Sequence, residues 1–88
     1  MNVVEILRAA REMPWCQNTF RREDGACCPL AAMSDGGSAA GRAAVEFLRI
    51  AADCKYILKW NDSPGRTHDE VLAAYDRAIA LAEQKAAS

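Results

Sequence analysis

The sequence predicts a mainly α-helical protein with three main helices, one short helix and a small hairpin or ordered loop at residues 15–28. In three stretches, apolar residues recur every three or four positions, which is the spacing of one face of an α-helix. Residues 15–28 lack this period and contain an Asp-Gly turn signal instead. The fold would be α+β if the hairpin forms. With 88 residues, the chain 1–88 is expected to be a single domain.

The first helix is expected from Val3 to Glu12. Asn2 followed by Glu5 is similar to a capping box, in which side chain and backbone of these two positions satisfy each other's hydrogen bonds. Pro14 should end the helix, because the residue before a proline is disfavoured in the helical conformation. The expected buried face consists of Val3, Ile6, Leu7 and Ala10.

Residues 15–28 are more irregular. Residues 17–20 suit a strand better than a helix, and Glu23-Asp24-Gly25 predicts a turn, because Asp and Gly tolerate positive φ. Residues 26–28 could return as a second short strand. Because an isolated hairpin is marginally stable in water, this segment must pack on the helices.

The middle of the chain predicts a short helix followed by a longer one. Pro29 suits a first helical turn, residues 30–34 have helical composition, and Asp35-Gly36-Gly37 ends that segment. Ser38 can cap the next helix, from Ala39 to about Ala52. Its expected buried face is rich in alanine, which allows neighbouring helices to approach closely, and consists of Ala40, Ala44, Phe47, Leu48 and Ala51.

Residues 53–60 are ambiguous, because they could extend this helix or form a separate turn. Residues 61–65, Asn-Asp-Ser-Pro-Gly, predict a turn. Thr67 with Glu70 forms a second capping box, so the last helix should run from His68 to about Lys85. Its expected buried stripe consists of Val71, Leu72, Tyr75, Ala78, Ile79 and Ala82.

Composition limits the function classes. The formal net charge is −1, and neither half is strongly basic, which argues against a dedicated nucleic-acid-binding module. Residues 30–52 fit a helix-turn-helix in outline, but the second helix offers no Asn or Gln for reading bases. No apolar run approaches the roughly 18 residues of a membrane span, and residues 1–13 lack the apolar stretch of a signal peptide. We therefore expect a cytoplasmic protein.

Four cysteines allow several interpretations. They are Cys16, Cys27, Cys28 and Cys54. In a protein without a signal peptide we expect reduced, buried thiols and no cofactor. The alternative is a thiol- or zinc-dependent protein that uses Cys16, Cys28, Cys54 and His68, although these spacings differ from the Cys pairs of structural zinc sites. A thiol enzyme would need Cys16 or Cys28 as nucleophile, His68 as base and Asp62 to orient it. We expect no enzyme.

Aromatic, amide and charged residues on either side of the two tryptophans form the candidate partner-binding site. They are Trp15, Gln17, Arg21, Arg22, Trp60, Asn61, Asp62 and Arg66. Trp and Arg are favoured anchors in protein interfaces. Alternatively, both tryptophans anchor irregular segments onto a thin, alanine-rich core, since eighteen residues are alanine.

Three sequence blocks resemble a family of small uncharacterised bacterial and phage proteins. The blocks are Trp15-Cys16-Gln17, then Asp24-Gly25-Ala26-Cys27-Cys28 leading into Ala31-Ala32-Met33, and then residues 60–67, W-N-D-S-P-G-R-T, with Glu70-Val71. The family shows W-C-Q-G, C-x-x-G-A-L and W-N-D-x-P-G-R-T-x-x-E-V. Asn18 replaces the Gly of the first motif, and Ala31 and Met33 replace the Gly and Leu of the second.

The resemblance implies no activity, but it suggests a phage or mobile-element context. The function expected in that context is a non-enzymatic intracellular protein that acts by binding another protein. A natural version is an inhibitor of a host defence complex, such as an anti-CRISPR protein.

Overall fold

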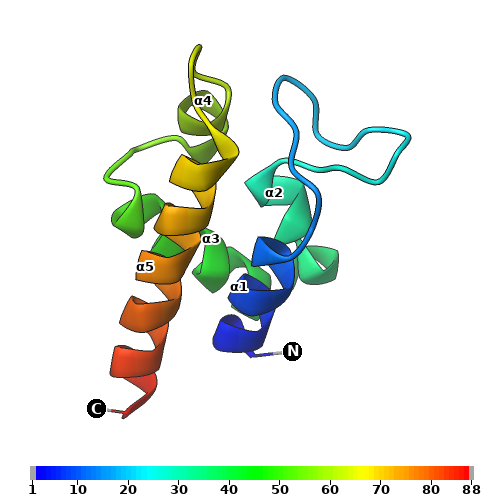
Figure 1. The fold of residues 1–88 in the computed structure, drawn as a ribbon. Helices are drawn as coiled ribbons and strands as arrows, with labels where there is room; N and C mark the ends of the chain where they lie inside the picture. The colour runs from blue at the N-terminus through cyan, green and yellow to red at the C-terminus, as the bar shows by residue number, and fades with distance from the viewer. Residues whose placement is uncertain (1, 88) are drawn as a thin grey trace.

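Three long helices surround the apolar core in the computed structural model, which describes residues 2–87 (Figure 1). They are α1 (Val3–Arg11), α3 (Ala39–Ala51) and α5 (His68–Ala87). Shorter elements connect them: α2 (Pro29–Ala32), the 3-10 turn η1 (Asp35–Gly37) and α4 (Ile57–Asn61). The mainly α-helical class with three main helices is therefore confirmed. No helix within residues 2–87 is both long and apolar enough to cross a membrane.

The predicted capping box of α1 is present. Asn2 Oδ1 accepts a hydrogen bond from the Glu5 backbone N–H at 2.9 Å, and Glu5 Oε1 accepts one from the Asn2 backbone N–H at 3.0 Å. Two exposed ion pairs then join α1 to α5: Arg8 with Glu83 at 3.0 Å, and Arg11 with Asp76 at 2.7 Å. Exposed pairs contribute little free energy, so the buried face of α1 must supply most of its stability. That face is Ile6, Leu7 and Ala10.

Residues 15–28 form the ordered loop, and the hairpin is not found. The turn is where the sequence predicts it, because the Arg22 N–H donates to the Ala26 carbonyl at 2.7 Å and Gly25 has φ of 91°. Strand-like pairing is limited to isolated bridges that Cys27 makes with Trp15 and Arg21. The returning limb, from Ala26 to Cys28, is buried. Packing on the helices, rather than strand pairing, therefore orders this loop.

The ambiguous segment forms a separate short helix. α3 ends at Ala51, and Asp53 has φ of 53°, which a continuous helix does not allow. The chain becomes helical again at Ile57 and forms α4. The structure thus has two short helices where the sequence predicted one.

Gly41 permits the closest approach in the core. A Cβ atom at Gly41 would lie 2.6 Å from the Ser34 carbonyl oxygen and 2.7 Å from that of Met33. The alanine-rich face predicted for α3 is only partly correct, since the structure buries Gly41, Ala44 and Leu48 and leaves Ala40, Phe47 and Ala51 half-buried. The missing side chain of Gly41 lets α3 lie against the segment that follows α2.

Replacement of Gly41 by alanine should therefore destabilise the protein. Alanine is favoured over glycine in a helix by about 1 kcal/mol, but the added methyl group would overlap two backbone oxygens. We expect the free energy of unfolding to fall by about 1–3 kcal/mol, as for overpacked cores, when measured by urea denaturation. Ala73→Gly, at an exposed position of α5, calibrates the propensity effect alone. A Gly41→Ala protein as stable as wild type would contradict this close approach.

The cap of α5 gives a second prediction. Thr67 Oγ1 accepts from the Glu70 backbone N–H at 3.2 Å, and Glu70 Oε1 accepts from the Thr67 backbone N–H at 3.0 Å. Thr67→Ala removes the first of these bonds and should cost about 0.5–2 kcal/mol of unfolding free energy. Thr19→Ala, in the exposed part of the loop, is the matched control. Equal unfolding midpoints for the two variants would show that Thr67 does not act as a cap.

Candidate functional site

A buried asparagine joins the start of the loop to the end of α4. Trp15 Nε1 donates to Asn61 Oδ1 at 2.6 Å, and Asn61 Nδ2 donates to the Cys16 carbonyl at 3.1 Å and to Asp62 Oδ1 at 3.2 Å. Asn61 has 0% of its surface exposed, so water cannot replace these partners. Asn61 is therefore a structural link between segments more than forty residues apart in sequence.

Further hydrogen bonds close the same junction. Gln17 Nε2 donates to the carbonyls of Asn61 at 2.8 Å and Ser63 at 3.1 Å. The backbone N–H of Asn18 donates to Asp62 Oδ1 at 2.8 Å. We call the seven residues of this network the clasp: Trp15, Cys16, Gln17, Asn18, Asn61, Asp62 and Ser63.

Local sequence explains why the clasp forms here. Ile57 and Asn61 are four residues apart on α4, so both face the interior. Asn18 has φ of 64°, a left-handed conformation that Gly adopts freely and Asn tolerates better than most residues. This backbone conformation explains how Asn18 can occupy the position of the Gly in the W-C-Q-G motif that the sequence resembles.

Two ring contacts lie beside the clasp. The imidazole of His68, at the start of α5, stacks on the Trp15 indole with ring centroids 5.4 Å apart and planes inclined by 11°. The Arg66 guanidinium lies 4.3 Å from the centroid of the Trp60 ring. Stacked aromatic rings and cation–π pairs are each worth about 0.5–1.5 kcal/mol. Both tryptophans are therefore fixed in orientation, and both remain partly accessible to solvent.

Arg66 is held by more than the ring. Its Nε donates to the Trp60 carbonyl at 2.9 Å, and it pairs with Glu70 at 3.0 Å, which leaves 20% of its side chain exposed. Hydrogen bonding from the Thr67 backbone, and secondarily the Arg66 charge, lowers the pKa of Glu70. Glu70 thus stays ionised near neutral pH and connects Arg66 to the helix cap.

Arg21 and Arg22 lie further along the loop. Arg22 makes two hydrogen bonds to the carboxylate of Asp24, at 2.8 and 3.3 Å, which reinforce the turn. A hydrogen bond from the Ala26 backbone, followed by the Arg22 bonds, lowers the pKa of Asp24. Both arginines are exposed. They therefore present positive charge at the turn, apart from the clasp itself.

The structure brings together six of the eight candidate residues: Trp15, Gln17, Trp60, Asn61, Asp62 and Arg66. The stacking of His68 on Trp15 was not predicted, since these residues are 53 positions apart. The exposure of three large side chains was not predicted either: Phe20 is 51% exposed, Tyr56 59% and Leu58 41%. The alternation of exposed Tyr56 and Leu58 with buried Ile57 was visible in the sequence, but its meaning depends on α4 being a surface helix.

The cysteines are arranged as core residues. Cys16, Cys27 and Cys28 are buried, and Cys54 is half-buried. Burial raises the pKa of the Cys16, Cys27 and Cys54 thiols, which disfavours the nucleophilic thiolate. In the part of the chain that the structure describes, no three His, Cys, Asp or Glu residues are grouped so that they could hold a metal ion.

The model of one protein family, described as a family of unknown function (DUF6197), matches residues 1–81. No curated protein and no solved structure matches the chain.

The clasp gives a prediction about stability. Asn61→Ala leaves the Trp15 indole N–H and the Cys16 carbonyl without their buried partner, and each unsatisfied group costs about 1–3 kcal/mol. We expect the free energy of unfolding to fall by about 2–4 kcal/mol, measured by urea denaturation followed by tryptophan fluorescence. Ser63→Ala is the control, because it removes only a hydroxyl bonded to the exposed Lys59 carbonyl. The structural role of Asn61 would be wrong if both variants unfolded at the same midpoint.

Proposed function

The chain belongs to the DUF6197 family of unknown function, and we propose that it is a non-enzymatic protein that binds another protein through the end built by the clasp. The observation that carries this proposal is the distribution of exposed apolar side chains. Of the four large hydrophobic residues exposed in residues 2–87, three lie on the two segments that the clasp joins: Phe20, Tyr56 and Leu58. In Figure 1, the loop and α4 occupy the same end of the molecule, opposite the chain termini.

The clasp makes this end rigid, which favours binding. Trp15, Trp60 and Arg66 each have a fixed partner, so little side-chain entropy would be lost when a partner protein contacts them. Partly exposed Trp and Arg side chains are the residue types most often found as energetic anchors in interfaces. The surface thus combines preorganised aromatic rings with positive charge from Arg21 and Arg22.

Each candidate residue takes a distinct role in this proposal. Asn61 is buried and supports the surface without touching the partner. Gln17 and Asp62 hold the loop in place and contribute polar edges. Trp15 with His68, and Trp60 with Arg66, supply the ring surfaces. Arg21 and Arg22 supply charge that would select an acidic region of the partner.

The raised thiol pKa values support a non-enzymatic role, because a catalytic cysteine needs an accessible thiolate. The thiol- or zinc-dependent alternative would be favoured by bound zinc in untagged protein, or by a thiol that reacts with iodoacetamide faster than a model peptide. The nucleic-acid alternative would be favoured by steeply salt-dependent retention on heparin.

The narrower form of the proposal is an inhibitor of a host defence complex, as in an anti-CRISPR protein. Support comes from the small size, the preorganised surface and the phage-like sequence blocks. Expression in a bacterium with an active CRISPR system should then restore plating of a targeted phage. Loss of restoration with Arg21→Ala or Arg22→Ala, but not with Arg8→Ala, would assign the effect to the clasp end.

Binding to any partner can be tested with the same variants. Truncation of an interface anchor typically weakens binding by about tenfold or more, so Arg21→Ala, Arg22→Ala and His68→Ala should each lose most captured partner in a pull-down quantified by mass spectrometry. Thermal midpoints should stay within a few degrees of wild type, because these side chains are exposed. Arg66→Ala is unsuitable, because it also breaks the contacts with Trp60 and Glu70.

Arg8→Ala is the matched control, since Arg8 is an exposed arginine on α1 with a single ion pair to α5. Equal capture by the Arg8 variant and the three clasp-end variants would contradict the proposed surface.

A further inference from the structure

A continuous hollow follows α3 and α5, away from the clasp. Three cavities of about 450, 230 and 410 Å³ lie in a row along the two helices. The first and second share Ala43, Phe47 and Lys85, and the second and third share Ile50. We call this hollow the trough, and the residues of α3 and α5 that line it are Ala43, Glu46, Phe47, Ile50, Ala51, Arg77, Ala80, Leu81, Ala82, Gln84, Lys85 and Ala86.

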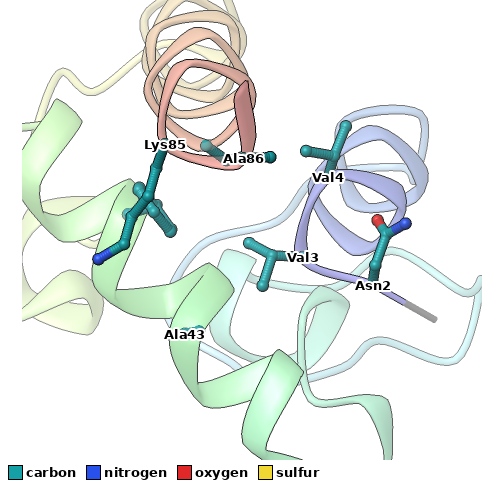
Figure 2. A pocket seen from close by; sticks show the side chains of 8 residues that line it. Asn2, Val3, Val4, Ala43, Lys85 and Ala86 are labelled. Atoms are coloured by element: carbon teal, nitrogen blue, oxygen red, sulfur yellow. The ribbon is translucent and has the colours of Figure 1, made fainter. Parts of the chain in front are cut away.

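The floor of the trough is apolar and accessible. Figure 2 shows its first cavity, where Val3 and Val4 of α1 face Ala86 of α5 above Ala43 of α3. Ile50 lies at the junction of the second and third cavities and is 54% exposed. A contiguous apolar surface of this kind on a small protein is typical of an interaction site.

The two rims of the trough carry opposite charge. Glu46 lies on the α3 rim, and Lys85 and Arg77 lie on the α5 rim. Glu46 and Lys85 line the same cavity, so they stand at the same height on opposite sides. An acidic rim facing a basic rim is a self-complementary pattern, because a second copy turned over presents its basic rim to the acidic one.

We propose that a second copy of this chain covers the trough, in a symmetric dimer whose two-fold axis runs along the trough. This axis places α3 of one copy over α5 of the other, so Glu46 of each copy faces Lys85 of the other at the same height. A two-fold axis across the trough would instead place α3 over α3 and like charges together. Isologous two-fold contacts are the commonest form of homodimer.

The size of the trough sets the expected strength. The 13 residues of α3 extend about 20 Å, and two adjacent helices are about 20 Å wide. The contact would lie near the lower limit for specific interfaces, so we expect a dimer with a Kd in the range of about 10–100 μM. This inference is independent of the proposed function, because it concerns a different face.

The experiment is sedimentation equilibrium of the full chain at concentrations up to about 500 μM, well above that Kd. Wild type should be in a monomer–dimer equilibrium. Glu46→Lys places lysine against lysine and Lys85→Glu places glutamate against glutamate, so each variant alone should associate at least tenfold more weakly. An equimolar mixture restores both opposite-charge contacts and should form a mixed dimer, as should the double variant E46K/K85E with itself.

Ile50→Gln tests the apolar floor and should also weaken association at least tenfold. Leu58→Gln is its control, because Leu58 is similarly exposed but lies on α4, so it should dimerise like wild type. Circular dichroism establishes that each variant is folded. A wild-type chain that stays monomeric at about 500 μM, an Ile50→Gln chain that dimerises normally, or a charge-reversed mixture that fails to associate would each overturn the proposal.

Discussion

The arrangement of this small protein depends on the buried amide of Asn61. Three long helices can pack through alanine and glycine, but their faces do not specify where an irregular loop and a short helix should lie. Asn61 does so, because its donors and acceptor need partners in a site that water does not reach. Those partners are Trp15 and the Cys16 carbonyl, so one side chain orients both the loop and α4.

The core illustrates how a chain with few large apolar residues can still be closely packed. Alanine contributes little buried area, but it allows helices to approach, and Gly41 extends this principle to direct contact with backbone oxygens. The larger side chains, such as Leu7, Met33 and Leu48, are fully buried between the long helices. The remaining large hydrophobic residues are left at the surface, where they define two separate faces: the clasp end and the trough.

These two faces have different characters, which fits different partners. The clasp end combines fixed aromatic rings with unbalanced positive charge, a combination suited to a foreign acidic surface. The trough is apolar with one acidic and one basic rim, a pattern that complements itself. A dimer through the trough would leave both clasp ends accessible, because the loop and α4 do not line it.

The sequence alone determined the helices and their starts, because capping is a local interaction between residues three positions apart: the caps at Asn2 and Thr67 are where the sequence predicts them. It also identified six residues that meet in the clasp region. Only the tertiary structure decided that Asn61 is buried, that α4 is separate from α3, that Gly41 rather than an alanine makes the closest contact, and that residues 15–28 form a loop. The reason is that each of these depends on what a distant segment places against the residue, and periodicity carries no information about that neighbour.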